Sequence, residues 1–482
     1  MTVAEHIGTV WDRDILGPLQ DYITIPNVSA AYEPQWEQLG HMERAVELIS
    51  SWCSQRRIEG MTIEVQRLAG RSPLIVIEVP PFGVHTDDPD DAAAADDADT
   101  VLLYGHLDKQ PEMTGWRNGL GPWTPVLDGD RLYGRGGADD GYAAFASLAA
   151  IEAVQSHGGS HRRCVVLIEA SEESGSPDLP AHLEALGDRL RGTSLVLCLD
   201  SGCLDYERLW VTTSLRGLVG GLLRVDILDE GVHSGLASGV APSSFRIVRQ
   251  LLDRIEDPST GRVLLPEFHV GIPEQRVQEA VAAAGVVDPF ASTLPFVPGA
   301  SPTTDDPVEQ LLAHTWRPAV SVVGADGLPP ADRAGNVLRP FTALRLSVRI
   351  PPTCDHVRAA AALEAELLRD PPYGARITFD ADHVAPAWHA PPFAPWLQQS
   401  LEQASRDAFG NGACAFGEGG TIPFMGMLGE RFPDAQFVIT GVLGPASNAH
   451  GPNEFLHLPT ARRVTEVLAR VLVDHAARAR TT

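Results

Sequence analysis

The sequence predicts an α/β protein whose main domain has a mostly parallel central sheet flanked by helices. Short apolar runs at residues 100–104, 164–169 and 195–199 have the length and composition of buried strands, and an alanine-rich helical pattern at 141–153 separates the first two. Strands that alternate with helices are typical of parallel sheets. The length of 482 residues suits two or three domains.

The elements before this block are a helix and a strand. Apolar residues recur at helical spacing over 42–52, and residues 72–79, SPLIVIEV, are rich in β-branched side chains. Residues 87–99, DDPDDAAAADDAD, are acidic and have no large apolar group. This composition predicts a mobile surface insertion, to which we assign no role.

From about residue 213 the pattern changes. We expect a strand at 218–227, an amphipathic helix at 243–255 and an alternating, half-buried strand at 341–350. This block predicts a smaller α/β sandwich inserted into the main domain. The expected domains are the main domain in two parts, 1–212 and 389–482, and the inserted domain, 213–388.

Charge and cysteine content exclude several classes of protein. The net charge is −26, so nucleic acid and anionic membranes would repel the chain. Nearly all basic residues are arginine, and Lys109 is the only lysine. The six cysteines are scattered without a CxxC pair, as expected for free thiols in a reducing compartment. With no signal-peptide pattern and no membrane-spanning apolar run, these features predict a cytoplasmic protein.

Histidine and acidic residues follow the predicted strands or lie in glycine-rich turns. In open α/β sheets, sites form beyond the carboxyl ends of the strands. Imidazole and carboxylate together suit zinc, with manganese or cobalt as alternatives, and two such metals can share a carboxylate, hold a hydroxide and polarise a carbonyl. The candidate residues are His106, Asp108, Asp139, Glu172, Glu173, Asp200 and His450.

Each of these residues alone is weak evidence, but their order along the chain is informative. The motifs GHLD, GRGGADD, EASEESGS, LCLDSG and SNAHGPNE occur in this sequence. With them the chain resembles the di-zinc metallopeptidases, which include carnosinases, bacterial dipeptidases, aminoacylases and glutamate carboxypeptidases. The resemblance extends over nearly the whole chain. It is strongest to the carnosinase and cytosolic dipeptidase branch, through LLYGHLDKQPE at 102–112 and DGDRLYGRGGADD at 128–140.

The resemblance implies two Zn²⁺ ions per subunit, with Mn²⁺ or Co²⁺ possible. His106 and Asp200 would hold one metal, and Glu173 and His450 would hold the other. Asp139 would bridge the two, and the Asp139–Asp140 peptide is commonly cis in this family.

Further roles follow from the same resemblance. Asp108 would orient the ring of His106. Glu172 would be the general base, which takes a proton from water and passes it to the leaving amine. His233, in GVHSG, would stabilise the oxyanion in the active site of a neighbouring subunit, which implies a homodimer. The inserted domain would then be a lid and dimerisation domain. A plain turn histidine is the alternative for His233.

Four residues would contact the substrate. Arg349, in SVRIPP, resembles an arginine that binds the substrate carboxylate, and a planar guanidinium suits that pairing. Asn336, in GNVLRP, resembles another contact. Gly420 and Thr421, in GEGGTIP, resemble a loop that receives the carboxylate through backbone amides and a hydroxyl. A surface arginine at a strand end is the alternative for Arg349.

The expected function is metal-dependent hydrolysis of an amide bond in a dipeptide or an N-acyl or N-aminoacyl amino acid, with a small-molecule substrate as the partner. An amide-forming or carbamoyl-cleaving enzyme and an inactive relative are the alternatives. The sequence departs from the family at Gly141 and Tyr142, where relatives usually have lysine and glycine. This departure leaves the expected ligands intact but puts the substrate preference in doubt.

Overall fold

The computed structural model describes residues 1–84 and 99–478. The expected acidic insertion at 87–99 therefore lies outside the described residues, apart from Asp99. The described chain folds into two compact units. The first consists of Met1–Thr212, Ala390–Ala415 and Met427–Thr482, and the second of Thr213–His389 and Phe416–Gly426.

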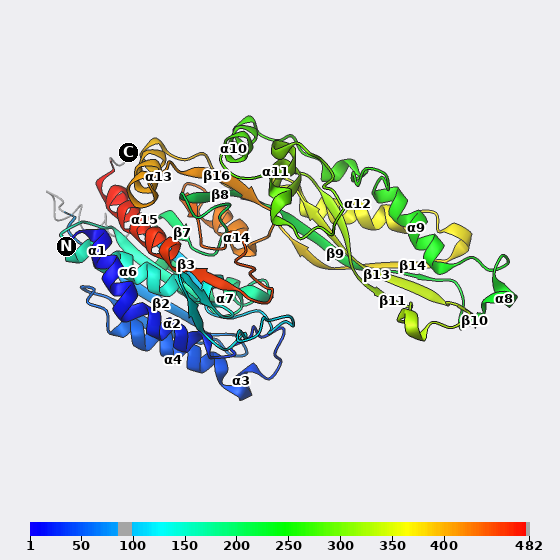
Figure 1. Cartoon of the computed structure of the whole chain (residues 1–482), viewed down its shortest axis with the longest axis horizontal. Helices are drawn as coiled ribbons and strands as arrows, with labels where there is room; N and C mark the ends of the chain where they lie inside the picture. Colours follow the sequence, from blue (N-terminus) through cyan, green and yellow to red (C-terminus); the bar gives the residue numbers. More distant parts are fainter. Residues whose placement is uncertain (85–98, 479–482) are drawn as a thin grey trace. The chain divides into compact units, whose positions relative to one another are not determined.

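The first unit is built around a mixed sheet, with strands in the order β1-β2-β6-β3-β7-β17-β8 (Figure 1). The inner strands β6, β3, β7 and β17 run parallel, and the remaining pairs are antiparallel. The strands are β1 (Thr62–Gln66), β2 (Leu74–Val79), β3 (Thr100–His106), β6 (Arg163–Glu169), β7 (Thr193–Cys198), β8 (Trp210–Leu215) and β17 (Gln436–Ile439). The expected α/β class with a mostly parallel central sheet is confirmed.

The helix α6 (Ala143–Ser156) is the centre of the first unit's core. Its residues from Ala143 to Val154 are buried, because small alanine side chains let it pack closely on β3 while α1 and α15 cover its other side. The other helices of the unit are α1 (Val3–Val10), α2 (Leu16–Ile23), α3 (Trp36–Leu39), α4 (His41–Ser54), α7 (Leu179–Leu186), α13 (Pro395–Phe409) and α15 (Leu458–Ala477). A small antiparallel sheet contains β4 (Val126–Asp128), β5 (Arg131–Tyr133) and β18 (Phe455–His457).

The second unit is a four-stranded antiparallel sheet with helices packed on it, which is the α/β sandwich expected for this part of the chain. The order is β11-β13-β9-β14, with β11 (Ala319–Asp326), β13 (Phe341–Ile350), β9 (Gly217–Asp226) and β14 (Arg376–Ala385). The helices α9 (Ser244–Ile255) and α12 (His356–Leu368) share one apolar core with this sheet. Further elements are α8 (Ser234–Ala237), α10 (Glu274–Ala284), α11 (Pro307–Thr315), β10 (Val232–His233), β12 (Val337–Leu338) and β15 (Trp388–His389).

Two elements lie where the chain passes between the units, β16 (Cys414–Glu418) and α14 (Pro423–Arg431). Within the described residues, no helix is both long and apolar enough to cross a membrane. All six cysteines are described, and none is in a disulfide.

Candidate metal centre

Three ligand atoms come together at the carboxyl edge of the parallel strands. His106 is the last residue of β3, Asp200 follows β7, and Asp139 lies in the turn before α6. The His106 Nε2 atom is 3.3 Å from Asp139 Oδ1 and 3.7 Å from Asp200 Oδ2. All three residues are buried. Parallel strands end at one edge of a sheet, so residues far apart in the sequence meet there.

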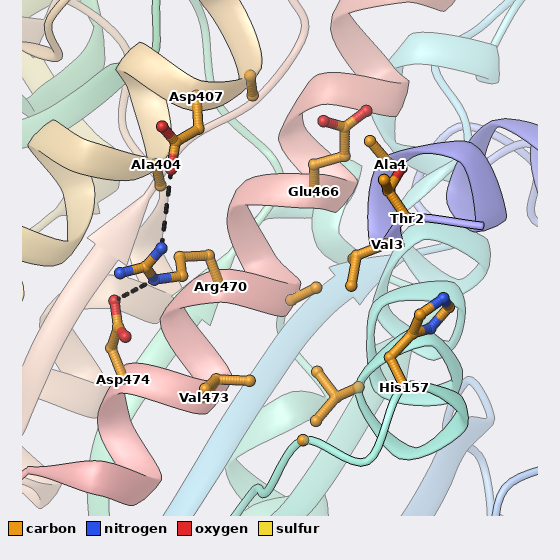
Figure 2. A pocket seen from close by; sticks show the side chains of 14 residues that line it. Thr2, Val3, Ala4, His157, Ala404, Asp407, Glu466, Arg470, Val473 and Asp474 are labelled. Atoms are coloured by element: carbon orange, nitrogen blue, oxygen red, sulfur yellow. Dashed lines mark hydrogen bonds and ion pairs between the residues drawn. The ribbon is translucent and has the colours of Figure 1, made fainter.

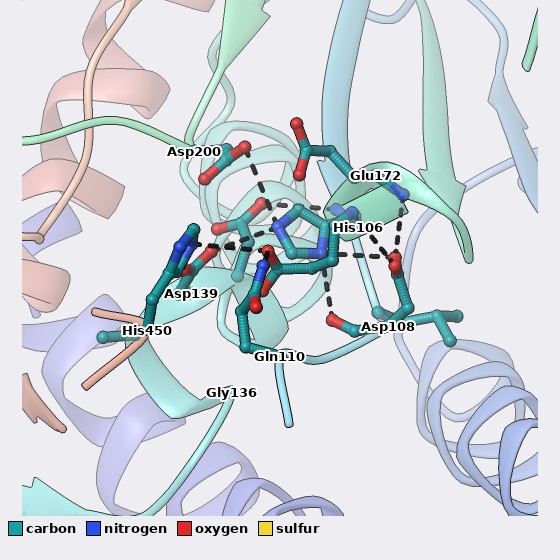
Figure 3. Close-up of polar contacts among 12 residues, drawn as sticks. His106, Asp108, Gln110, Gly136, Asp139, Glu172, Asp200 and His450 are labelled. Carbon is teal, nitrogen blue, oxygen red and sulfur yellow. Dashed lines mark hydrogen bonds and ion pairs between the residues drawn. The ribbon is translucent and has the colours of Figure 1, made fainter. Parts of the chain in front are cut away.

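A second group uses the other oxygen of Asp139. The His450 Nε2 atom is 3.0 Å from Asp139 Oδ2 and 3.3 Å from Glu173 Oε2. In both groups the possible ligand atoms lie within 4.8 Å of one another. Asp139 therefore presents one carboxylate oxygen to each group (Figure 3). The Asp139–Asp140 peptide is cis, as expected.

The charges at this edge favour bound cations. Burial raises the pKa of Glu173 well above its usual range, and the neighbouring Asp139 carboxylate raises it further. Burial alone would also raise the pKa of Asp139, but hydrogen bonds from His106 and His450 hold that pKa below its usual value. The buried Glu173 Oε1 atom has no hydrogen-bond partner among the described residues. A buried anionic oxygen without a partner is costly, and a divalent cation bound by imidazole and carboxylate would relieve that cost. The donor set therefore fits metal ions in both groups.

Asp108 connects the two loops that carry ligands. The Nδ1 atom of His106 faces it, 3.1 Å from its carbonyl oxygen and 3.5 Å from Oδ1. Its carboxylate also accepts hydrogen bonds from the backbone N–H groups of Glu172 and Glu173, at 3.1 Å each. One fully buried side chain thus faces the imidazole ring and fixes the turn of the two glutamates.

Glu172 belongs to neither ligand group. In Figure 3 its carboxylate lies on the same side of His106 as Asp200, away from His450. Burial raises the pKa of Glu172 well above its usual range, and the charge of Asp200 is the next largest cause. A carboxyl group in this position can hold a proton beside the ligands.

Sequence reasoning missed a partner of Glu173. The Gln110 Nε2 atom donates a hydrogen bond of 2.6 Å to Glu173 Oε2, and Gln110 is buried. The only signal for Gln110 in the sequence is its position four residues after His106, in the loop that follows β3. Because this bond engages Oε2, it fixes the orientation of a carboxylate whose other oxygen is unpartnered.

The departure at Gly141 and Tyr142 has a packing reason. A side chain at position 141 would collide with the ring of Tyr22 and lie 2.5 Å from the Gly136 carbonyl oxygen. The Tyr142 side chain is fully buried, and its hydroxyl donates a hydrogen bond of 2.7 Å to the carbonyl of Leu199, next to Asp200. Tyr142 therefore packs inside the unit, behind a candidate ligand.

Lys109 belongs to the loop after β3, between Asp108 and Gln110. Its side chain is fully buried, and Nζ donates hydrogen bonds to the carbonyls of Tyr22 (2.8 Å) and Ile25 (2.7 Å). Nζ also lies 3.9 Å from the centre of the Tyr22 ring. The only lysine of the chain therefore connects the loop after β3 to the end of α2 through buried hydrogen bonds.

The second unit brings Arg349 and Thr421 together. Arg349 Nη1 donates a hydrogen bond of 3.0 Å to Thr421 Oγ1, which itself donates one of 2.5 Å to the carbonyl of Arg216. Burial lowers the pKa of Arg349. Gly420, next to Thr421, is exposed, and no atom would crowd a carbon placed on it.

His233 and Asn336 are neighbours at another place in the second unit. His233 pairs with Val337 between β10 and β12, and the Asn336 carbonyl accepts a hydrogen bond of 2.8 Å from the N–H of Ser234. Both His233 and Asn336 are exposed. The site residues expected in the inserted domain thus lie at two places in this unit. Arg349, Thr421 and Gly420 are at one place, and His233 and Asn336 are at the other.

A cavity of about 550 Å³ lies elsewhere in the first unit, among α1, α6, α13 and α15 (Figure 2). Valine and alanine side chains line much of it, and Arg470 forms ion pairs with Asp407 and Asp474 beside it. None of the predicted site residues lines this cavity.

Comparison with known proteins gives relatives that are peptidases. The chain is 29% identical over 374 residues to the cysteinylglycine-S-conjugate dipeptidase of Corynebacterium striatum, which covers 74% of this chain and 77% of that protein. It is 25% identical over 346 residues to the human Beta-Ala-His dipeptidase, which covers 69% of this chain and 66% of that protein.

Solved structures share the fold. Human carnosine dipeptidase 1 matches with a TM-score of 0.73 and 20% identity, over 99% of both chains. The di-peptidase Dug1p of Saccharomyces cerevisiae matches with a TM-score of 0.76 and 20% identity, over 99% of this chain and 98% of that one. Residues 102–474 match the family described as peptidase family M20/M25/M40. Because this match extends over most of the chain, the protein belongs to the peptidase family M20/M25/M40.

Proposed function

We propose that this peptidase hydrolyses the amide bond of dipeptides or similar small amino-acid conjugates with two zinc ions per subunit, which manganese or cobalt could replace. The observation that carries the proposal is the division of Asp139 between two ligand groups, with one carboxylate oxygen facing each. The relatives named above act, by their names, on cysteinylglycine conjugates and on Beta-Ala-His.

In this proposal His106, Asp139 and Asp200 would hold one metal ion, and Asp139, Glu173 and His450 would hold the other. When bound, such a pair of ions would polarise the carbonyl of the scissile amide and lower the pKa of water. Asp108 and Gln110 orient the ligands that they contact.

Glu172 is the proposed general base. It takes a proton from the attacking water at its carboxylate oxygen and delivers it to the leaving amine nitrogen, so that the C–N bond breaks with the proton on nitrogen. Its position outside both ligand groups supports this role, because a metal ligand could not also carry the proton.

The second unit, as the proposed lid and dimerisation domain, supplies the substrate contacts. Arg349 would bind the free carboxylate of the substrate, with Thr421 and the backbone of Gly420 beside it, and Asn336 would make a further contact. The partner of Arg349 is the uncharged hydroxyl of Thr421, which leaves the charge of the guanidinium for a substrate carboxylate and supports this role. We further propose a homodimer in the cytoplasm, in which His233 of one copy stabilises the oxyanion in the other.

The experiment that tests this function is hydrolysis of a small panel of substrates. The panel contains dipeptides, β-alanyl-histidine, a cysteinylglycine S-conjugate, N-acyl amino acids and the same dipeptides with amidated carboxyl ends. Each is incubated with Zn²⁺, Mn²⁺ or a chelator. We expect metal-dependent release of free amino acids and much slower cleavage of the amidated peptides. If the protein contains two metals and cleaves none of the panel, the dipeptidase proposal is wrong.

A further inference from the structure

A fully buried ion pair lies behind the second ligand group. Arg135 Nη1 is 2.6 Å from Glu454 Oε2, and both side chains are almost completely buried. Neither Arg135 nor Glu454 has a role in the proposed mechanism. Removing two charges from water is costly unless each is fully paired, so such a pair must be held in good geometry.

This pair joins the two loops that carry Asp139 and His450. On one side, Glu454 Oε1 accepts hydrogen bonds from the N–H groups of Gly136 (2.9 Å) and Ala138 (3.4 Å), the residue before Asp139. On the other side, Arg135 Nη2 donates a hydrogen bond of 2.8 Å to the carbonyl of Gly451, the residue after His450. One carboxylate and one guanidinium therefore fix the backbone beside two ligands.

The loop around His450 needs such support. Four of its non-glycine residues have φ between 56° and 64°, a left-handed backbone that side chains disfavour; these are Ala446, Asn448, His450 and Asn453. The His450 side chain is 56% exposed, so packing does little to hold its ring. Hydrogen bonds to the loop backbone must therefore provide much of the restraint. At Gly451, next to the candidate ligand, the N–H donates within the loop to the carbonyl of Asn448, and the bond from Arg135 ties the carbonyl to a residue outside the loop.

We propose that Arg135 and Glu454 are positioning residues, which set the affinity of the metal ion held by His450 and Glu173. This inference rests on the proposed metal site. The pair acts through the backbone: it holds Gly451 and Ala138 at fixed places, so that His450 Nε2 and Asp139 Oδ2 stay 3.0 Å apart. The guanidinium is suited to this because its planar fork donates to a carboxylate and a carbonyl at once.

The test is zinc binding to the metal-free protein, measured by competition with a chromophoric chelator. The variants are Arg135→Lys, which keeps the charge but loses the fork, and Glu454→Gln, which keeps the shape but loses the charge. The reference for loss of the second site is His450→Ala. We expect both variants to bind one of two zinc ions at least about 10-fold more weakly, the usual effect of losing such a partner, while the tighter ion changes little.

The matched control is Arg163→Lys, which alters a partly buried arginine–carboxylate pair with Glu78 on β6 and β2, away from the ligands. It should bind both zinc ions like the unaltered protein. Urea unfolding of the metal-free variants separates stability from affinity. If Arg135→Lys and Glu454→Gln fold and bind both ions normally, the proposal is wrong.

The remaining outcomes are also decisive. If neither variant folds, the pair is a requirement of the fold and the proposed role is overturned. If the unaltered protein binds no zinc, the metal site itself fails, which is a different result from normal binding in the variants.

Discussion

At the scale of single residues, the two adjacent glutamates show how one turn can serve two tasks. The side chain of Glu173 points to the second ligand group, and Gln110 fixes it there. Glu172 is directed to the side of Asp200 and is not part of either group. The carboxylate of Asp108 holds both backbone N–H groups, so the division between the two side chains is set by one buried residue.

Glu172→Gln separates these tasks. The amide cannot take a proton from water, so we expect turnover to fall by about 10²–10⁴-fold while both metal ions remain bound. Glu173→Gln should instead lose metal, because it changes a proposed ligand. Turnover number and metal content, measured for each purified variant, check this prediction. Near-normal turnover in Glu172→Gln would show that another group is the base.

At the scale of elements, the start of α6 depends on a residue without a side chain. Gly141→Ala would force its new methyl group against the Tyr22 ring and the Gly136 carbonyl. We expect this overpacking to destabilise the protein by about 1–3 kcal/mol, seen as a lower urea midpoint. Gly8→Ala in α1 is the control, since nothing lies within 4 Å of the added carbon, and it should be neutral or stabilising. Equal midpoints for both variants would contradict this account.

The pairing of β2 with β6 predicts a pH effect on stability. Glu78 accepts hydrogen bonds from Arg189 (2.5 Å) and Arg163 (2.8 Å); burial opposes ionisation, but these partners hold the pKa of Glu78 below its usual value. A carboxyl group with a lowered folded pKa stabilises the fold above the unfolded pKa, about 4.3, and this contribution is lost as the pH falls through the folded pKa. Glu78→Gln should therefore lower the urea midpoint at pH 7 and make progressively less difference below about pH 4. A difference that does not depend on pH would exclude this ionic contribution.

The strands and the candidate ligands could be predicted together, for one physical reason. Buried parallel strands appear as apolar runs, and the polar residues that follow them meet at one edge, as His106 and Asp200 do. The direction of β2 and β8, which run opposite to the inner strands, could not be predicted, because hydrophobic periodicity does not specify the partner of a strand. The pair Arg135–Glu454 could not be predicted either, since its members are 319 residues apart and only the tertiary structure brings them together.

At the scale of the whole molecule, the proposed dimer can be tested by mixing inactive subunits. His233→Ala and Glu172→Gln should each be impaired alone. If His233 serves the site of its partner, mixed dimers contain one site with an intact Glu172 and an intact incoming His233, so up to about a quarter of all sites regain activity after subunit exchange. Activity assays of the mixture after mild denaturation and refolding measure this. A self-contained site would give no recovery.

Because Lys109 is buried, cleavage at this residue by a protease can report local unfolding of the loop after β3. A protease that cuts only after lysine has one possible target, the bond between Lys109 and Gln110, and this bond lies in the loop that follows the candidate ligand His106. The native loop is closed to such an enzyme, so cleavage requires a local unfolding event. Zinc should slow the cut and a chelator should accelerate it, because bound metal stabilises the closed loop. The yield of two fragments on a gel would then measure how often the metal site opens, without any substrate.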